Sequence, residues 1–225
     1  MSEARLTLTR DMVRARLKAA GAPGVRRSPA APDAPGRGDH DLNPGFRPEG
    51  EPVPAAVLVP IIERTGGLSV LLTVRAAHLS DHAGQIAFPG GRIEPGDAGA
   101  PETALREAFE EVCLEPAAIE VAGRLDTYLT RTGYAVVPIV GLLAGDVAPR
   151  ADPSEVAEIF EVPLDFLINP AHHERRSRMV EGRLRTFYAV PFGRHFIWGA
   201  TAGMIVNLSE ILAQAVPGAQ WPDDR

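Results

Sequence analysis

The chain has 225 residues, of which 45% are hydrophobic and 23% are charged, proportions that are typical of globular proteins. Its net charge of −6 argues against a general nucleic-acid-binding protein, because contacts to phosphates require a basic surface. The single cysteine, Cys113, excludes an intrachain disulfide and favours a cytoplasmic protein. No apolar run of about 18 residues is present, so no membrane-spanning helix is predicted.

The N-terminal region is predicted to form a helix followed by an extended arm. Met12, Val13, Leu17 and Ala20 recur at helical spacing, which indicates an amphipathic helix. Residues 21–54 are rich in proline, glycine, alanine and arginine, which predicts an extended and poorly packed segment. The chain is therefore divided into an N-terminal helix and arm (1–52), a main domain (53–217) and a C-terminal tail (218–225).

The main domain is predicted to begin with a β-hairpin. Two apolar runs, 55–62 and 69–74, are separated by the turn sequence Thr65-Gly66-Gly67. A polar loop over 75–99 leads to a helix at 101–112, with proline in its first turn, where a missing amide donor costs little. Further strands are expected at 120–125, 136–143, 159–162 and 184–190, and a final helix at 201–215. This mixture predicts an α/β fold with helices packed on a sheet.

The helix at 101–112 is predicted to place three glutamates on one face. Glu107, Glu110 and Glu111 occupy positions i, i+3 and i+4, where like charges repel one another by a few tenths of a kcal/mol. A bound cation would remove this repulsion, and oxygen ligands on a rigid helix suit Mg²⁺ or Mn²⁺. The alternative is a solvated acidic face, with Glu102 and Glu110 each paired with Arg106. The residues expected to face the core are Leu105, Ala108, Phe109 and Val112.

A loop that precedes this helix makes the pattern more specific. Phe88-Pro89-Gly90-Gly91 ends in two glycines, which allow the backbone to approach a ligand or a metal closely. Glu94 and Asp97 lie between the glycines and the helix. A Gly-Gly turn by itself is compatible with a purely structural role, whereas the combination of loop and glutamate helix favours a functional site.

These residues resemble the Nudix hydrolase family, whose box reads G-x5-E-x7-R-E-U-x-E-E-x-G-U, with U aliphatic. The match runs from Gly91 through Asp97 to residues 106–111 and Leu114. Asp97 stands where the box has glutamate, the loop is one residue longer, and Cys113 replaces the later glycine. The resemblance implies an α/β/α sandwich with a mixed sheet between helices. It also implies hydrolysis of a nucleoside diphosphate linked to another group.

The sequence upstream of the box resembles the coenzyme A diphosphatase branch of this family. The matching leader comprises residues 71–75, 78–79, 82–85 and 88–91, and residues 153–164 and 197–202 are also similar to that branch. The resemblance implies cleavage of coenzyme A or acyl-CoA to 3′,5′-ADP and a 4′-phosphopantetheine product. ADP-ribose, a dinucleotide or a nucleoside triphosphate are alternative substrates, and a non-catalytic binding module is a further alternative.

The resemblance also implies roles for individual residues. Glu107 and Glu111 are implied as principal metal ligands, with Glu110 as a third ligand or as the group that orients water. A carbonyl of Gly90 or Gly91 would complete the coordination. Arg106 is expected to orient the carboxylates through an ion pair with Asp97 or Glu110.

The general base and the substrate contacts are less determined by the motif. Glu155 and Glu158 are candidates for the base, or ordinary polar residues near a strand. Arg75 is a candidate phosphate ligand or a surface ion pair. Tyr128 is a candidate for stacking on adenine, together with Thr130, Arg131 and Tyr134, or part of a simple hairpin loop.

Two histidines and a basic run have open roles. His78 and His82 are structural residues or candidate bases. The basic run at 172–178 is a candidate for binding the 3′-phosphate of coenzyme A, or a solvated loop. The expected partner is a small molecule rather than a nucleic acid or a membrane, and a homodimer is possible because dimers are common among relatives.

Overall fold

The computed structural model describes residues 8–21, 37–44, 50–79, 82–180 and 182–213. The helices are α1 (Arg10–Ala20), α2 (Ala100–Val112), α3 (Leu164–Leu167) and α4 (Ala200–Ala213), with short 3₁₀ turns η1 (Pro116–Ala118) and η2 (Pro170–His172). The first six strands are β1 (Arg37–Gly38), β2 (Val53–Arg64), β3 (Gly67–Arg75), β4 (Ile86–Ala87), β5 (Gly90–Arg92) and β6 (Ile119–Arg124). The others are β7 (Tyr128–Leu129), β8 (Tyr134–Leu143), β9 (Val156–Pro163), β10 (Glu174–Val180), β11 (Arg183–Phe192) and β12 (His195–Trp198).

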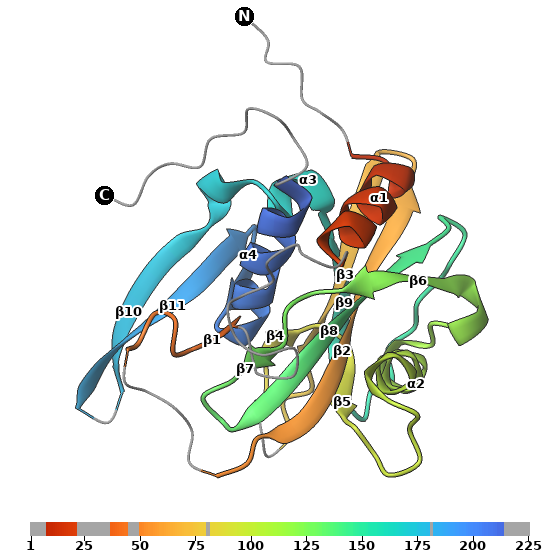
Figure 1. Ribbon diagram of the computed structural model, residues 1–225. Coiled ribbons are helices and arrows are strands. Elements are labelled where there is room, and N and C mark those ends of the chain that lie inside the picture. Colours follow the sequence, from red (N-terminus) through yellow and green to blue (C-terminus); the bar gives the residue numbers. More distant parts are fainter. Residues whose placement is uncertain (1–7, 22–36, 45–49, 80–81, 181, 214–225) are drawn as a thin grey trace, which may run out of the picture.

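The molecule is a layered α/β structure, as predicted. Strands β1 to β9 form a nine-stranded mixed sheet, and β10, β11 and β12 form a separate three-stranded antiparallel sheet. Helix α2 covers one face of the large sheet, while α1 and α4 lie on the other face (Figure 1). The predicted sandwich of helices around a mixed sheet is therefore confirmed. No described helix is long and apolar enough to span a membrane.

Strand β2 lies at the centre of the sheet and determines where the glycine pair is placed. It pairs in parallel with β8 along most of its length and in an antiparallel fashion with β3, which confirms the predicted hairpin. Its N-terminal half pairs with β5, so that Val57 lies opposite Gly90 and Ala56 opposite Gly91. The predicted loop over 75–99 therefore contains the two short strands β4 and β5, which fix the glycines beside the buried centre of the sheet.

The buried face of α2 differs from the prediction. Ala104, Ala108 and Val112 are fully buried against the sheet, whereas Phe109 is 44% exposed, so its predicted place in the core is wrong. At about 100° per residue, Phe109 lies about 120° from the centre of a face formed by the two alanines, and therefore outside it. The small alanine side chains allow the helix to lie close to the sheet, and the same rotation brings Glu111 into the buried face.

The N-terminal region packs onto the domain wherever it is described. Val13 and Leu17 of α1 are buried, which confirms the predicted amphipathic helix. Strand β1 pairs in parallel with β7, and the Asp39 carboxylate accepts hydrogen bonds from the Tyr128 hydroxyl (2.8 Å) and the Arg131 amide (2.6 Å). The prediction of a poorly packed arm is therefore wrong for residues 37–44. Residues 22–36, 45–49 and the predicted tail 218–225 lie outside the described residues.

Several of the remaining elements follow the predicted pattern. Strands β6, β8, β9 and β11 and helix α4 occupy the predicted positions, whereas β1, β4, β7, β10, β12 and α3 were not predicted. A solvated loop was one of the two interpretations of the basic run at 172–178, but from Glu174 onward the run forms β10, which pairs with β11 over seven residue pairs. Arginine and serine have no strong strand pattern, so this strand forms through its backbone pairing with β11.

Candidate active site

Glu111 is the most buried acid of the glutamate helix. It is 3% exposed in the last turn of α2, and its carboxylate accepts a hydrogen bond from the Gly90 amide. Arg75 Nη1 is the nearest cationic atom, at 3.7 Å from Glu111 Oε1. Burial raises the pKa of Glu111 to about 8, because the positive charge of Arg75 offsets only part of the desolvation penalty.

Glu107 lies one turn earlier, directly against the glycine pair. A Cβ atom added to Gly91 would collide with the Glu107 carboxylate, so a larger residue at this position would displace that carboxylate. Burial raises the pKa of Glu107, and the neighbouring carboxylates of Glu110 and Glu155 act in the same direction. Glu107 and Glu111 therefore form a partly desolvated acidic pair beside β5.

Arg106 connects the loop to the glutamates. Its guanidinium forms an ion pair with Asp97 (3.1 Å) and donates to Glu107 and Glu110, both at 3.0 Å. Hydrogen bonding from Arg106 holds the pKa of Asp97 well below its ordinary range, assisted by the Glu94 amide and the Thr103 hydroxyl. The predicted ion pairs of Arg106 with Asp97 and with Glu110 are both present, so the aspartate that replaces the glutamate of the box has a defined partner.

Glu110 differs from the other two glutamates. Its side chain is 52% exposed, and its described partner is Arg106, four residues earlier on the same helix. The three glutamates span about 100° of the helix surface, with Glu111 toward the sheet and Glu110 toward solvent. The three glutamates therefore lie on one side of the helix, and their exposure increases from Glu111 through Glu107 to Glu110.

Glu155 and Glu158 occupy different surroundings. Glu155 precedes β9, its carbonyl accepts a hydrogen bond from the Ala76 amide (2.8 Å), and its charge raises the pKa of both Glu107 and Glu111. Glu158 instead binds Arg194 (2.5 Å) and His195 (3.1 Å). Of the two candidate bases, Glu155 is the one whose charge acts on the glutamate pair.

The donor set fits a hard divalent cation, although the side chains require rearrangement. No three described acid, histidine or cysteine side chains are grouped closely enough to hold a metal ion, so the predicted three-glutamate site is not preformed. Glu107 and Glu111 nevertheless provide buried carboxylate oxygens with no close cation other than arginine. Mg²⁺ and Mn²⁺ prefer such ligands, and a bound cation would offset the desolvation that raises both pKa values.

The structure contradicts the predicted role of Tyr128. This residue is 5% exposed, its hydroxyl binds Asp39, and its ring lies against Gly203 of α4. Burial raises the pKa of Tyr128, with the carboxylate of Asp39 acting in the same direction. A ring enclosed in this way offers no open face to an adenine, so Tyr128 is a core residue.

The other open candidates lie apart from the glutamates or have local partners. His172 stacks on Phe166, and His173 binds the carbonyl of Leu167. Of the arginines of β10, Arg176 and Arg178 project from one face of the small sheet, where they lie over aromatic rings of β12, and Arg175 projects from the other face. His78 and His82 lie near the leader and contact the Ser154 carbonyl and the Gln85 side chain, respectively.

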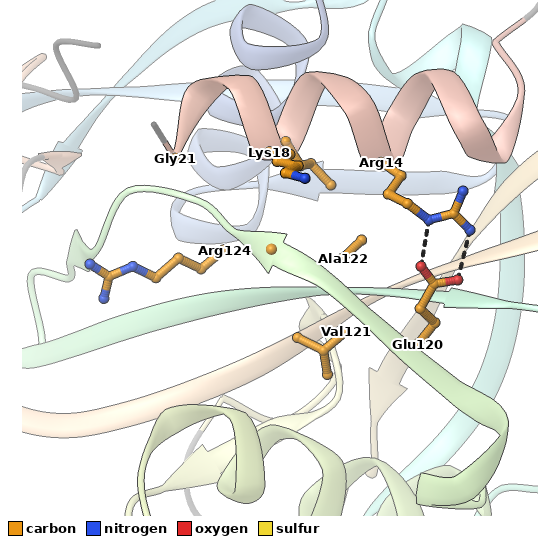
Figure 2. A pocket seen from close by; sticks show the side chains of 9 residues that line it. Arg14, Lys18, Gly21, Glu120, Val121, Ala122 and Arg124 are labelled. Atoms are coloured by element: carbon orange, nitrogen blue, oxygen red, sulfur yellow. Dashed lines mark hydrogen bonds and ion pairs between the residues drawn. The ribbon is translucent and has the colours of Figure 1, made fainter. Parts of the chain in front are cut away.

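A groove on the other side of the sheet is separate from this site. It lies between α1 and β6, and Arg14 crosses it to bind both carboxylate oxygens of Glu120 (Figure 2). Val121 points from β6 away from α1 in this view. The groove therefore belongs to the packing of the N-terminal helix rather than to the glutamate pair.

One pair of residues near the glutamates was missed from the sequence. Arg92 follows Gly91 directly, and its guanidinium donates to the Tyr134 hydroxyl at 2.7 Å and lies 5.5 Å from the centre of the Tyr134 ring. The sequence feature that could have identified Arg92 is its position directly after the glycine pair. Its partner, 42 positions later, follows only from the pairing of β5 and β8 with β2.

Comparison with known proteins identifies the family. The NUDIX domain model matches residues 52–181, which is more than half of the chain. The uncharacterized Nudix hydrolase NudL of Escherichia coli strain K12 is 41% identical over 155 residues, covering 69% of this chain and 80% of NudL. Among solved structures, a Nudix hydrolase from Alicyclobacillus acidocaldarius is similar, with a TM-score of 0.47 and 17% identity over 72% of this chain and 93% of that one. The C. elegans Ap4A hydrolase is similar with a TM-score of 0.43 and 20% identity, over 49% and 80% of the respective chains.

Nudix hydrolases bind small molecules that contain a linked nucleoside diphosphate, and they typically use divalent metal ions. The glutamates on α2, the arginine that holds them and the glycine pair of β5 all lie within the matched range. The family model and the match to NudL together show that this chain belongs to the Nudix hydrolases, a family of diphosphohydrolases.

Proposed function

We propose that this Nudix hydrolase cleaves the diphosphate of coenzyme A or acyl-CoA to 3′,5′-ADP and an (acyl-)4′-phosphopantetheine. The observation that carries the proposal is the position of the coenzyme A-type leader. The described leader residues, 71–79 and 82–91, contain the end of β3, β4 and the start of β5, with the glycine pair against Glu107. Arg75, within this leader, is the cation that approaches Glu111. The segment that resembles the coenzyme A branch thus forms a wall of the glutamate site.

The proposal assigns the metal to the buried glutamates. Glu107 and Glu111 would hold Mg²⁺ or Mn²⁺, with Glu110 joining them after release from Arg106. When bound, such a cation neutralises phosphate charge and lowers the pKa of water. Arg106 keeps the carboxylates oriented, and Gly90 and Gly91 allow the diphosphate to approach the backbone closely.

Glu155 is proposed as the general base. Water attacks one phosphorus atom, a new P–O bond forms, and the phosphoanhydride P–O bond breaks. Glu155 accepts the proton of the attacking water, and the departing phosphate carries the electron pair of the broken bond. The proximity of Glu155 to Glu107 and Glu111, seen in its effect on both pKa values, supports this role.

Other nucleoside diphosphate derivatives remain the alternative substrates. The basic run at 172–178 was the candidate for recognising the 3′-phosphate, and its arginines are divided between two faces of β10. His172 and His173 are bound to carbonyls of the neighbouring turn. ADP-ribose, a dinucleotide and a nucleoside triphosphate are therefore the appropriate comparators.

A substrate panel tests the proposal. Purified protein is incubated with each compound at equal concentration, with Mg²⁺, with Mn²⁺ or with a chelator, and the products are identified by mass spectrometry. We expect the highest kcat/KM for coenzyme A or its acyl derivatives, with no turnover in chelator. Glu107→Gln should reduce turnover at least 100-fold, while Glu115→Gln, an exposed acid just after α2, should not. Faster cleavage of another compound would reject the coenzyme A assignment.

A further inference from the structure

Arg92 is joined through its backbone to the centre of the candidate active site. It is the last residue of β5, and the preceding Gly91 lies against the Glu107 carboxylate. The Arg92 carbonyl accepts a hydrogen bond from Arg106 Nη2 at 3.4 Å. The position of Arg92 is therefore tied to the same arginine that orients the glutamates.

The side chain of Arg92 is held in one direction by Tyr134. Arg92 of β5 lies opposite Ala55 of β2, and Tyr134 of β8 lies opposite Val53 of β2. The two side chains therefore project from the same face of the sheet, from the strands on either side of β2. The guanidinium makes both a hydrogen bond and a cation–π contact with the tyrosine, as described above. An exposed arginine otherwise has many rotamers, and ordering it requires such contacts.

No carboxylate among the described residues neutralises the charge of Arg92. Arg106 and Arg75 each lie beside carboxylates of the site. Within the part of the chain that the structure describes, no carboxylate pairs with Arg92, and its side chain is exposed. A guanidinium has five N–H donors, of which Tyr134 takes one, and the remaining planar fork matches the geometry of phosphate oxygens.

We infer that Arg92 binds a phosphate oxygen of the substrate, with Tyr134 as the positioning residue that orders the Arg92 guanidinium. This inference rests on the proposed cleavage of a diphosphate. In this arrangement Arg92 would contact a phosphate group that extends past the glycine pair, on the face of β5 opposite α2. Because the contact is made to the bound substrate as well as during reaction, it contributes mainly to binding.

Kinetics of matched variants test the inference with the best diphosphate substrate of the panel. We expect Arg92→Gln to raise KM about tenfold and to change kcat less than twofold. The KM of Arg92→Lys should lie between those of wild type and Arg92→Gln, because lysine keeps the positive charge but lacks the planar guanidinium fork. Tyr134→Leu should also raise KM. The double variant should have nearly the same KM as Arg92→Gln, since both substitutions act through one guanidinium. Equal KM values for wild type and Arg92→Gln would overturn the inference.

Arg183→Gln is the matched control. Arg183 is also an exposed arginine, but it lies at the start of β11 in the separate three-stranded sheet, outside the basic run at 172–178. Its replacement should leave KM unchanged, and a rise as large as that of Arg92→Gln would reject a specific role for Arg92. Urea unfolding of each variant checks that folding is intact.

A binding measurement separates this inference from the proposed function. The probe is α,β-methylene-ADP with Mg²⁺, measured by titration calorimetry, which requires no turnover. Weaker binding to Arg92→Gln, by about tenfold, would support the inference even if coenzyme A were not cleaved. Unchanged binding would overturn it even if coenzyme A were cleaved, whereas the substrate panel alone decides the proposed function.

Discussion

Arg75 Nη1 and Glu111 Oε1 lie 3.7 Å apart, at the junction of the end of β3 and the last turn of α2. This distance exceeds that of a normal hydrogen bond, so the ion pair offsets the burial of Glu111 only in part. Burying the charged form of Glu111 therefore costs stability, although this residue stands where the Nudix box has a glutamate.

Glu111→Gln should abolish activity without lowering the stability of the metal-free protein. A neutral amide removes the desolvated charge, and we expect the free energy of unfolding in chelator at pH 8 to rise by about 1 kcal/mol. Turnover should fall at least 100-fold, since a carboxylate ligand is lost. Urea unfolding and kinetic assays on the same preparation measure both effects. A variant that lost stability and activity together would indicate a structural role instead.

Gly91→Ala should damage the site more than the fold. The added Cβ would displace the Glu107 carboxylate, which is the end of a flexible side chain and can move at little cost in stability. Gly66→Ala is the control, because its Cβ would meet no atom within 4 Å. The two variants should therefore unfold at similar temperatures, whereas turnover should fall clearly only in Gly91→Ala. Full activity in Gly91→Ala would show that Glu107 can move without consequence.

Cys113 offers a test of the position where the box has glycine. Its φ of 54° places it in the left-handed region at the end of α2, which costs an L-residue about 1–2 kcal/mol. Cys113→Gly should raise the free energy of unfolding by about 1 kcal/mol and leave turnover unchanged. Cys113→Ala, which keeps the backbone penalty, separates this effect from loss of the thiol. Equal stability of the glycine and alanine variants would refute the backbone explanation.

The pH dependence of stability should reflect Glu161. Burial alone would raise the pKa of Glu161, but its hydrogen bonds with Arg64 and Ser69 outweigh that effect and lower the pKa. The ionised form is therefore favoured in the folded state. This contribution is complete above the unfolded pKa, near 4.5, and is lost as the pH falls through the folded value.

Glu161→Gln tests this assignment. It should lower the free energy of unfolding at pH 7 by about 1–2 kcal/mol, and the difference from wild type should shrink below about pH 4. Urea midpoints at pH 7, 5 and 3.5 measure the trend, with Glu115→Gln as an exposed control. A difference that stayed constant across this range would contradict the assigned ion pair.

Local patterns in the sequence were sufficient for most of the secondary structure. The hairpin of β2 and β3, the glutamate helix and the core-facing stripe of α1 follow from periodicity and turn residues, which act over a few positions. Strand β10 was missed because its residues carry no strand pattern, and its pairing partner lies beyond a turn. Phe109 was misplaced because helical spacing fixes the angle between residues but not the rotation of the helix on the sheet.

The sequence by itself determined the chemistry of the site: glutamates at fixed intervals on a helix, an arginine before them and a glycine pair upstream, all encoded within one continuous segment. Only the tertiary structure decided which glutamate is buried and that Tyr128 belongs to the core. It also decided that Arg92 meets Tyr134. Burial and contacts between distant residues depend on how helices and strands pack, and packing is a property of the whole chain rather than of any local pattern.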